Sequence, residues 1–163
     1  MNPIAAAMSG GVDSSAAVWL LRQAGYDPVG FTMSLFSPDA LPPAQRSQCH
    51  TARDVADAQA VAQRLSIPHH TLDLSESFRR EVMDPFVQAY EQGQTPNPCV
   101  LCNPRVKFAA LARVADRLGI RYIATGHYAR VTEENGLYYV RAAVSPERDQ
   151  SYMLYGLPQN ILA

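Results

Sequence analysis

The residues with the clearest chemical potential form a short loop close to the N-terminus. Ser9-Gly10-Gly11-Val12-Asp13-Ser14 follows an apolar run, Ile4 to Met8, and precedes an apolar helical pattern from Ala16 to Ala24. Glycine allows a backbone to approach a ligand closely and to adopt a positive φ. The N–H groups of such a turn, with the positive end of the helix, face bound oxyanions. The sequence therefore predicts an anion-binding turn between a strand and a helix.

A second loop, Thr95 to Pro104, is rich in proline and cysteine. Cys102 precedes Asn103, a residue type that caps helices, and Pro104, a residue type that suits the first helical position. This pattern places the Cys102 sulfur near the positive end of a helix predicted over Arg105 to Leu118. Two basic residues at the start of that helix add positive charge. Both effects favour the thiolate, so Cys102 is predicted to be a nucleophile or a metal ligand.

Alternating strand and helix patterns predict how these loops are held. The predicted strands are Ile4–Met8, Pro28–Leu35, His69–Leu74 and Tyr122–Thr125, and the predicted helices are Ser14–Ala24, His50–Leu65, Ser77–Gln92 and Arg105–Leu118, followed by a hairpin over Val131–Val140. Alternation of this kind is typical of βαβ units around a parallel sheet. We therefore expect an α/β fold, a three-layer open parallel sheet with helices on both faces.

The predicted fold brings separate motifs to one edge. Ligands of open parallel sheets bind beyond the carboxyl ends of the strands. The Ser9–Ser14 loop, Met33 and Gly126-His127-Tyr128 all fall at that edge. On the last predicted helix we expect an inward face, made of Phe108, Leu111, Ala112, Ala115 and Leu118.

Composition bounds the class of protein. A chain of 163 residues, 47% hydrophobic and 18% charged, is expected to be one globular domain. No apolar run approaches the roughly eighteen residues of a membrane span. The net charge of −1 gives only a modest electrostatic attraction to nucleic acid. Three cysteines without a secretion signal indicate a reducing, cytoplasmic location.

The Ser9–Ser14 loop has neither the Walker A nor the G-x-G-x-x-G spacing. It resembles the PP-loop of ATP pyrophosphatases. Further motifs follow in a fixed order: Gly30-Phe31-Thr32-Met33, Thr95-Pro96-Asn97-Pro98, Leu101-Cys102-Asn103, Val106-Lys107-Phe108, Ala124 to Arg130, and Asp149-Gln150-Ser151-Tyr152. Over nearly its whole length the chain resembles the tRNA-specific 2-thiouridylase family, which implies an adenine nucleotide alpha hydrolase-like fold.

The resemblance implies ATP-dependent replacement of the C2 oxygen of the tRNA wobble uridine by sulfur, through an adenylated intermediate. It implies an ATP site made of Ala7, Met8, Ser9, Gly10, Gly11, Val12, Asp13, Ser14, Met33 and Gly126, with Mg²⁺ beside Asp13, although Asp13 equally suits a helix-capping role. Asn97, Pro98 and Cys99 are expected to line the target base, with Cys102 as the nucleophile. His127, Arg148, Asp149 and Gln150 are expected to contact tRNA.

The source of sulfur stays open at this stage. Many relatives carry aspartate where this chain has Cys99, and the resulting Cys99-x-x-Cys102 spacing suits either ligation of an iron–sulfur cluster or a transient disulfide. A sulfur donor protein or sulfide is the expected co-reactant. Cys49, beside His50, matches no standard zinc spacing and is interpreted as incidental. The family is about twice this long, so residues 1–163 are expected to form its PP-loop ATP pyrophosphatase domain without its central and C-terminal domains.

Two other functions remain open. An amidating ligase fed with ammonia would share the Ser9–Ser14 loop, but it has no use for the Pro-Asn-Pro and Cys-Asn segment. A truncated, non-catalytic module that binds ATP or an iron–sulfur cluster would act with a separate tRNA-binding subunit. Dependence on sulfide or persulfide, rather than on ammonia, separates the first alternative from thiolation.

Overall fold

The computed structural model describes residues 2–36 and 52–163. Three features of the sequence lie outside these residues: the stretch Ser37–Ser47, whose prolines predict a loop, Cys49, and the predicted helix start at His50. The chain forms two compact units. The first holds the described residues up to Glu76 together with Ala110–Gly126, and the second holds Ser77–Ala109 and His127–Ala163.

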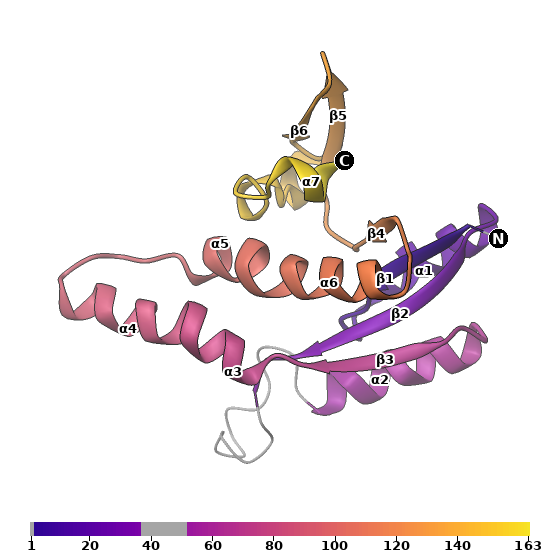
Figure 1. The fold of residues 1–163 in the computed structure, drawn as a ribbon, viewed down its shortest axis with the longest axis horizontal. Helices are drawn as coiled ribbons and strands as arrows, with labels where there is room; N and C mark the ends of the chain where they lie inside the picture. The colour runs from indigo at the N-terminus through magenta and orange to yellow at the C-terminus, as the bar shows by residue number, and fades with distance from the viewer. Residues whose placement is uncertain (1, 37–51) are drawn as a thin grey trace. The chain divides into compact units, whose positions relative to one another are not determined.

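A parallel sheet forms the centre of the first unit (Figure 1). Its strands are β1 (Pro3–Ala7), β2 (Asp27–Ser34), β3 (His69–Asp73) and β4 (Tyr122–Ala124), in the order β3-β2-β1-β4. Each lies within one residue or so of its predicted bounds. Three consecutive residues of β1, Ile4 to Ala6, are buried, as expected where both faces of a parallel sheet are covered.

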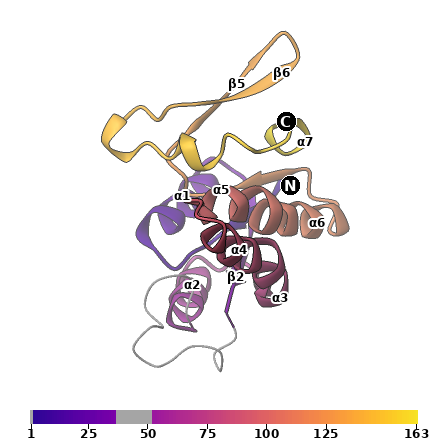
Figure 2. The ribbon, with the colours of Figure 1, turned by 90° about the vertical axis from the view of Figure 1, so that its left-hand side faces the viewer.

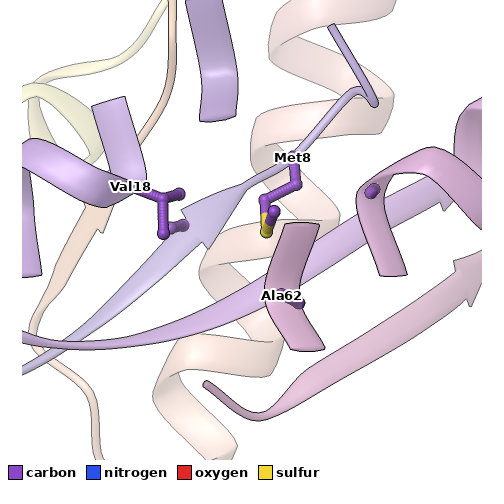
Figure 3. Packing of buried hydrophobic residues seen from close by; sticks show 5 residues of the cluster. Met8, Val18 and Ala62 are labelled. Atoms are coloured by element: carbon purple, nitrogen blue, oxygen red, sulfur yellow. The ribbon is translucent and has the colours of Figure 1, made fainter. Parts of the chain in front are cut away.

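Helices cover both faces of this sheet, which confirms the predicted layers. Helices α1 (Val12–Gln23) and α2 (Ala52–Arg64) lie on one face, and α6 (Ala109–Arg117) lies on the other (Figure 2). The buried cluster between α1, α2 and the sheet contains Ala6, Met8, Val18, Ala58 and Ala62 (Figure 3). Small residues in this cluster let the two helices approach β1 closely.

The second unit is built from short helices and a hairpin. The helical segments, beginning with α3 at the boundary between the units, are α3 (Ser75–Phe78), η3 (Arg79–Met83), α4 (Asp84–Glu91), α5 (Pro98–Cys102), η4 (Asn103–Phe108), η5 (Pro146–Arg148), η6 (Ser151–Met153) and α7 (Gln159–Leu162). The predicted hairpin is confirmed as β5 (Arg130–Glu134) and β6 (Leu137–Arg141). Asn135 and Gly136 at its turn have φ of 55° and 77°, as a two-residue hairpin turn requires.

The predicted loop Thr95–Pro104 is wrong over its second half, because α5 begins at Pro98. Asn97 is the N-cap, and its side-chain oxygen accepts the Cys99 N–H at 3.1 Å. Pro98 takes the first helical position. Asn103, the predicted cap, instead has helical backbone angles, and its buried amide donates to the Met153 carbonyl at 3.0 Å. A tertiary hydrogen bond therefore uses the side chain that the sequence offered as a cap.

The predicted inward face of the last long helix is also wrong at Leu118. Phe108, Leu111 and Ala115 are buried, but Leu118 is 54% exposed. The helix ends at Arg117, and Gly119, with φ of 66°, redirects the chain. Ile120, beyond the helix end, is buried instead.

Two glycines with similar positive φ are expected to differ in how much stability is lost when each is replaced by alanine. Gly10 has φ of 80°, and a Cβ there would lie 2.5 Å from the Asp54 carbonyl oxygen. Gly25 has φ of 85° but nothing within 4 Å of the same position. We expect Gly10→Ala to lower the free energy of unfolding by about 3 kcal/mol or more, since strain and a backbone clash add.

Gly25→Ala is the matched control, with an expected loss of about 1–2 kcal/mol from backbone strain alone. Urea unfolding of both variants measures the difference. Equal losses would contradict the packing of Gly10 against α2.

Candidate functional site

The turn after β1 is held by a serine of α1. The Ser14 hydroxyl is buried, accepts the Ser9 N–H at 3.1 Å and donates to the Gly11 carbonyl at 3.1 Å. The Ser9 and Ser14 hydroxyl oxygens are also 3.1 Å apart. With its one proton given to Gly11, the Ser14 hydroxyl accepts from Ser9. Ser14 therefore orders the turn from within rather than facing solvent.

The start of α1 suits an anion. Gly11 is the N-cap, has extended backbone angles and supplies no side-chain acceptor. The first N–H groups of any helix lack acceptors within the helix. Asp13 lies exposed in the first turn, and Val12 beside it is 79% exposed. The Ser9–Ser14 loop thus offers backbone donors and a helix N-terminus at an accessible surface, the arrangement that binds phosphate.

The strand order places this turn at the switch point of the sheet. β1 lies between β2 and β4, and ligands of open sheets bind where the strand order reverses. Gly126 follows β4, and a Cβ there would lie 2.7 Å from both the backbone nitrogen and the Cα of Ser14. Only glycine permits this approach. The predicted meeting of the loops after the first and fourth strands is therefore confirmed.

Met33, another residue predicted to contact nucleotide, lies in β2 one residue before its end and is 5% exposed. Ala7 ends β1, and Met8 is buried between that strand and the turn. The residues predicted for ATP therefore all lie in the first unit, at or near the carboxyl ends of β1, β2 and β4.

The cysteine pair lies in the second unit. Cys99 is exposed and Cys102 is buried, and neither is part of a disulfide. Cys99 lies in the first turn of α5, whereas Cys102 is the last residue of that helix. The effect of a helix N-terminus falls off within its first turn. The predicted helix-end environment of Cys102 is therefore wrong, and it applies to Cys99 instead.

The amino-acid signal for this cap is present twice. Asn-Pro occurs at Asn97-Pro98 and again at Asn103-Pro104. Only the second pair was considered from the sequence. The first pair forms the cap, and its signal is easily missed because the five residues of α5 show little periodicity.

The described part of the chain contains no group of side chains suited to hold a metal ion. Within residues 2–36 and 52–163, no three His, Cys, Asp or Glu side chains gather closely enough to hold a metal ion. Cys99 and Cys102 are thus a pair without a described third ligand. Cys49 lies outside the described residues. The two thiols alone do not fit a cluster, which takes four protein ligands in its common forms.

His127 is partly buried in the second unit. Its ring stacks on Phe108, with centroids 5.9 Å apart and planes at 28°. Burial, and then the positive charge of Lys107, lower the pKa of His127 below its ordinary value. The neutral imidazole therefore predominates at neutral pH, which suits stacking and hydrogen bonding rather than charge pairing with phosphate.

The residues predicted to contact tRNA also support one another. The Tyr128 N–H donates to the Gln150 side-chain oxygen at 2.9 Å, and the Gln150 N–H donates to the Tyr128 carbonyl at 2.8 Å. Arg148 donates to the Tyr128 hydroxyl at 3.0 Å and lies over its ring, 5.4 Å from the centroid. These contacts join Gly126-His127-Tyr128 to the Arg148–Gln150 segment.

Asp149 orders the same segment. Its carboxylate accepts the Ala143 N–H at 2.8 Å and the Ser151 hydroxyl at 2.8 Å. The hydrogen bond from the Ala143 N–H is the main reason why the pKa of this carboxyl lies below its ordinary value. Of the residues predicted to contact tRNA, Asp149 and Gln150 thus hold the local backbone, while Arg148 carries the positive charge.

The chain belongs to the family described as the tRNA methyl transferase HUP domain, whose model matches residues 2–163. It is 45% identical over 155 residues to the tRNA-specific 2-thiouridylase MnmA of Clostridium acetobutylicum, covering 95% of this chain and 44% of that protein. It is 48% identical over 159 residues to MnmA of Moorella thermoacetica, covering 96% and 44%. The resemblance to 2-thiouridylases is confirmed, and the chain spans less than half the length of these relatives.

Solved structures agree on the fold. A protein described as a predicted subunit of tRNA methyltransferase, from Methanocaldococcus jannaschii, superposes with a TM-score of 0.52 at 19% identity, covering 77% of this chain and 53% of that one. The glutamine-dependent NAD⁺ synthetase of Acinetobacter baumannii, in complex with adenosine diphosphate, gives 0.50 at 15% identity, covering 72% and 20%. Within residues 2–36 and 52–163, no helix has the length and apolar character to cross a membrane.

The lowered pKa of His127 predicts a pH dependence of stability. The unfolded chain takes up this proton near the ordinary pKa of 6.5, and the folded chain only at lower pH. Stability should therefore fall as the pH drops below about 6.5. His127→Phe retains a ring to stack on Phe108 and removes the titration, so its stability should fall less.

Urea unfolding at about pH 7.5 and about pH 5.5 measures this difference. Equal losses in the parent chain and in His127→Phe would contradict the assigned cause.

Proposed function

We propose that this chain binds ATP and acts in the 2-thiolation of uridine in tRNA. One observation carries the proposal. The glycine-containing turn leads into α1, whose start has no side-chain cap, and Gly126 after β4 lies against the first turn of this helix. Family membership and identity of about 45% to tRNA-specific 2-thiouridylases support the substrate class. Residues 1–163 are proposed to form one PP-loop ATP pyrophosphatase domain.

The proposed ATP site consists of Ala7 to Ser14, with Met33 and Gly126 beside the nucleotide. The backbone N–H groups at the start of α1 bind the phosphates, and the positive end of this helix favours their negative charge. Asp13 is exposed in the first turn of α1 and is the residue that would hold Mg²⁺. Magnesium bound to phosphates supplies further charge stabilisation for the departing pyrophosphate.

ATP makes the uridine oxygen a leaving group. The C2 oxygen of uridine attacks the α-phosphorus, the bond to pyrophosphate breaks, and an adenylated uridine forms. Sulfur then attacks C2, and AMP departs with the oxygen. Donors directed at the charge that develops on phosphate stabilise the first transition state. Asn97, Pro98 and Cys99 are proposed to line the target base.

Cys102 is the proposed sulfur carrier. A persulfide on a sulfur donor protein transfers its outer sulfur to the Cys102 thiolate and releases the donor's thiolate. The terminal sulfur of the resulting Cys102 persulfide then attacks C2 while AMP leaves. The Cys99 thiolate then attacks the Cys102 sulfur, so the sulfur–sulfur bond breaks, the thiocarbonyl remains on uridine, and a Cys99–Cys102 disulfide forms. An external thiol reduces this disulfide.

The different exposure of the two cysteines suits their different roles, Cys102 as sulfur carrier and Cys99 as resolving thiol. Cys102 is 6% exposed, which shields a persulfide from thiols in solution, and Cys99 is exposed to a reductant. Residues three apart on a helix share one side of it, so Cys99 is a reasonable resolving thiol for Cys102. tRNA is proposed to contact His127 and the Arg148–Gln150 segment, and the reaction is proposed to occur in the cytoplasm.

Gly11→Val tests the phosphate site. A Cβ on Gly11 meets only the Ser9 hydroxyl oxygen, at 3.4 Å, and φ at this residue is −81°. The fold should therefore tolerate the substitution, while the added methyl groups obstruct phosphates at the turn. We expect ATP affinity to fall at least about 100-fold by calorimetry, because several charge-assisted hydrogen bonds are lost together.

Ala16→Val, at an exposed position of the same helix, is the control and should bind ATP normally. Unchanged ATP affinity in Gly11→Val would remove the basis of the phosphate site.

Cys102→Ser tests the sulfur carrier. The hydroxyl cannot form a persulfide, so we expect 2-thiouridine formation to stop while ATP affinity remains within about twofold of the parent value. Mass spectrometry of tRNA nucleosides, after incubation with ATP, Mg²⁺ and a sulfide or persulfide donor, measures the product. Cys99→Ser should stop before product release, with tRNA held on Cys102 through a disulfide that an added thiol cleaves, because the resolving thiol is missing.

An equal loss of ATP affinity in Cys102→Ser would contradict the assignment of this residue. Incorporation of ammonia instead of sulfur would favour the amidating alternative, and ATP binding without any product would favour a non-catalytic module.

A further inference from the structure

A buried threonine of β2 lies directly behind the Ser9–Ser14 loop. Thr32 is fully buried, and its hydroxyl donates to the Met8 carbonyl at 2.9 Å. The same hydroxyl oxygen lies 2.8 Å from His69 Nε2. Because a hydroxyl has one proton and a carbonyl only accepts, Thr32 must accept from His69. The proton of the neutral His69 ring is therefore on Nε2.

These bonds hold the residue that precedes the loop. Met8 lies one position beyond the end of β1 and one before Ser9. Its N–H donates to the Phe31 carbonyl at 2.8 Å, and its carbonyl is bound by the Thr32 side chain. Both backbone polar groups of Met8 are thus fixed by β2. The Thr32 hydroxyl adds a side-chain bond to the Met8 carbonyl just beyond the end of β1, and it holds the chain where it turns.

The packing around this network is specific. Gly30 pairs with His69 in the sheet. A Cβ on Gly30 would lie 2.6 Å from the Met8 sulfur and 3.1 Å from the His69 Cδ2. The missing side chain gives both groups room on the face that α1 and α2 cover. Burial, and then the neighbouring His70, lower the pKa of His69, consistent with a neutral ring that donates from Nε2.

We infer that Thr32 and His69 are positioning residues for the phosphate site: they fix the Met8 carbonyl and so set the direction in which the Ser9–Ser14 loop leaves the sheet. The inference rests on the proposed ATP site. Neither residue belongs to the proposed set of ATP contacts. Their contribution passes through the backbone of Met8, because a rotation of that peptide changes where every following N–H group points.

Thr32→Val is the sharpest variant, since valine keeps the shape of threonine and removes the hydroxyl. It leaves the Met8 carbonyl and the His69 N–H without their partner. Thr32→Ser retains the hydroxyl and should restore binding. Thr71→Val is the matched control, because Thr71 pairs with Thr32 across the sheet but is exposed. His69→Gln retains an N–H donor, and His69→Leu removes it.

The measurement is calorimetric affinity for ATP and for inorganic pyrophosphate, at a temperature where thermal melts show each variant folded. We expect Thr32→Val and His69→Leu to weaken binding of both ligands roughly tenfold, the effect of one lost buried hydrogen bond. Thr32→Ser, His69→Gln and Thr71→Val should stay within about threefold of the parent chain. His69→Leu keeps the test open if Thr32→Val does not fold, because His69 is only partly buried.

Folded Thr32→Val or His69→Leu with parental affinity for ATP and pyrophosphate, and only a lowered melting temperature, would overturn the inference and leave the proposed function standing. A parent chain that binds neither ligand would overturn the proposed function, and the inference with it.

Discussion

Close approach of backbone to backbone at the start of α1 is the constraint on which the first unit depends. Gly126 lies against the backbone of Ser14, and Gly10 lies against the Asp54 carbonyl of α2, at distances where a Cβ would clash. Both contacts involve the turn between β1 and α1 or the first residues of α1. The turn needs a positive φ at Gly10 and an uncapped helix start at Gly11. An anion-binding site made of backbone groups requires this, because N–H donors converge only when no side chain keeps the segments apart.

The order of the strands explains why the convergence occurs here. β1 has β2 on one side and β4 on the other, so chain segments far apart in sequence arrive at the same carboxyl edge. Behind that edge, a network from Thr32 to Met8 and His69 continues the sheet by one hydrogen bond. The site is therefore held from the sheet, from α2 and from the loop after β4, and the loop itself contributes mainly the internal bonds of Ser14.

The second unit contains one element that the sequence predicts and one that it does not. The hairpin at Asn135-Gly136 was predictable, because few residue pairs accept positive φ at two consecutive positions. The cap of the cysteine helix was not. Asn-Pro occurs twice, the structure caps the helix at Asn97, and the side chain of Asn103 instead bonds to Met153, fifty residues away in sequence. The predicted burial of Leu118 was wrong for a related reason. The exposure of its side chain follows from where the helix ends, and not from the helical periodicity of the sequence.

The sequence by itself determined the parallel α/β architecture, the position of the glycine-containing turn and the family to which the chain belongs, because hydrophobic period, glycine placement and motif order are local properties of the chain. The tertiary structure decided which cysteine lies at a helix start, that Gly126 is needed for packing on α1, and that Thr32 holds the Met8 carbonyl. These depend on contacts between residues distant in sequence, which no local pattern encodes. A buried hydrogen bond forms only when the fold brings both partners together and removes the water that would otherwise satisfy them.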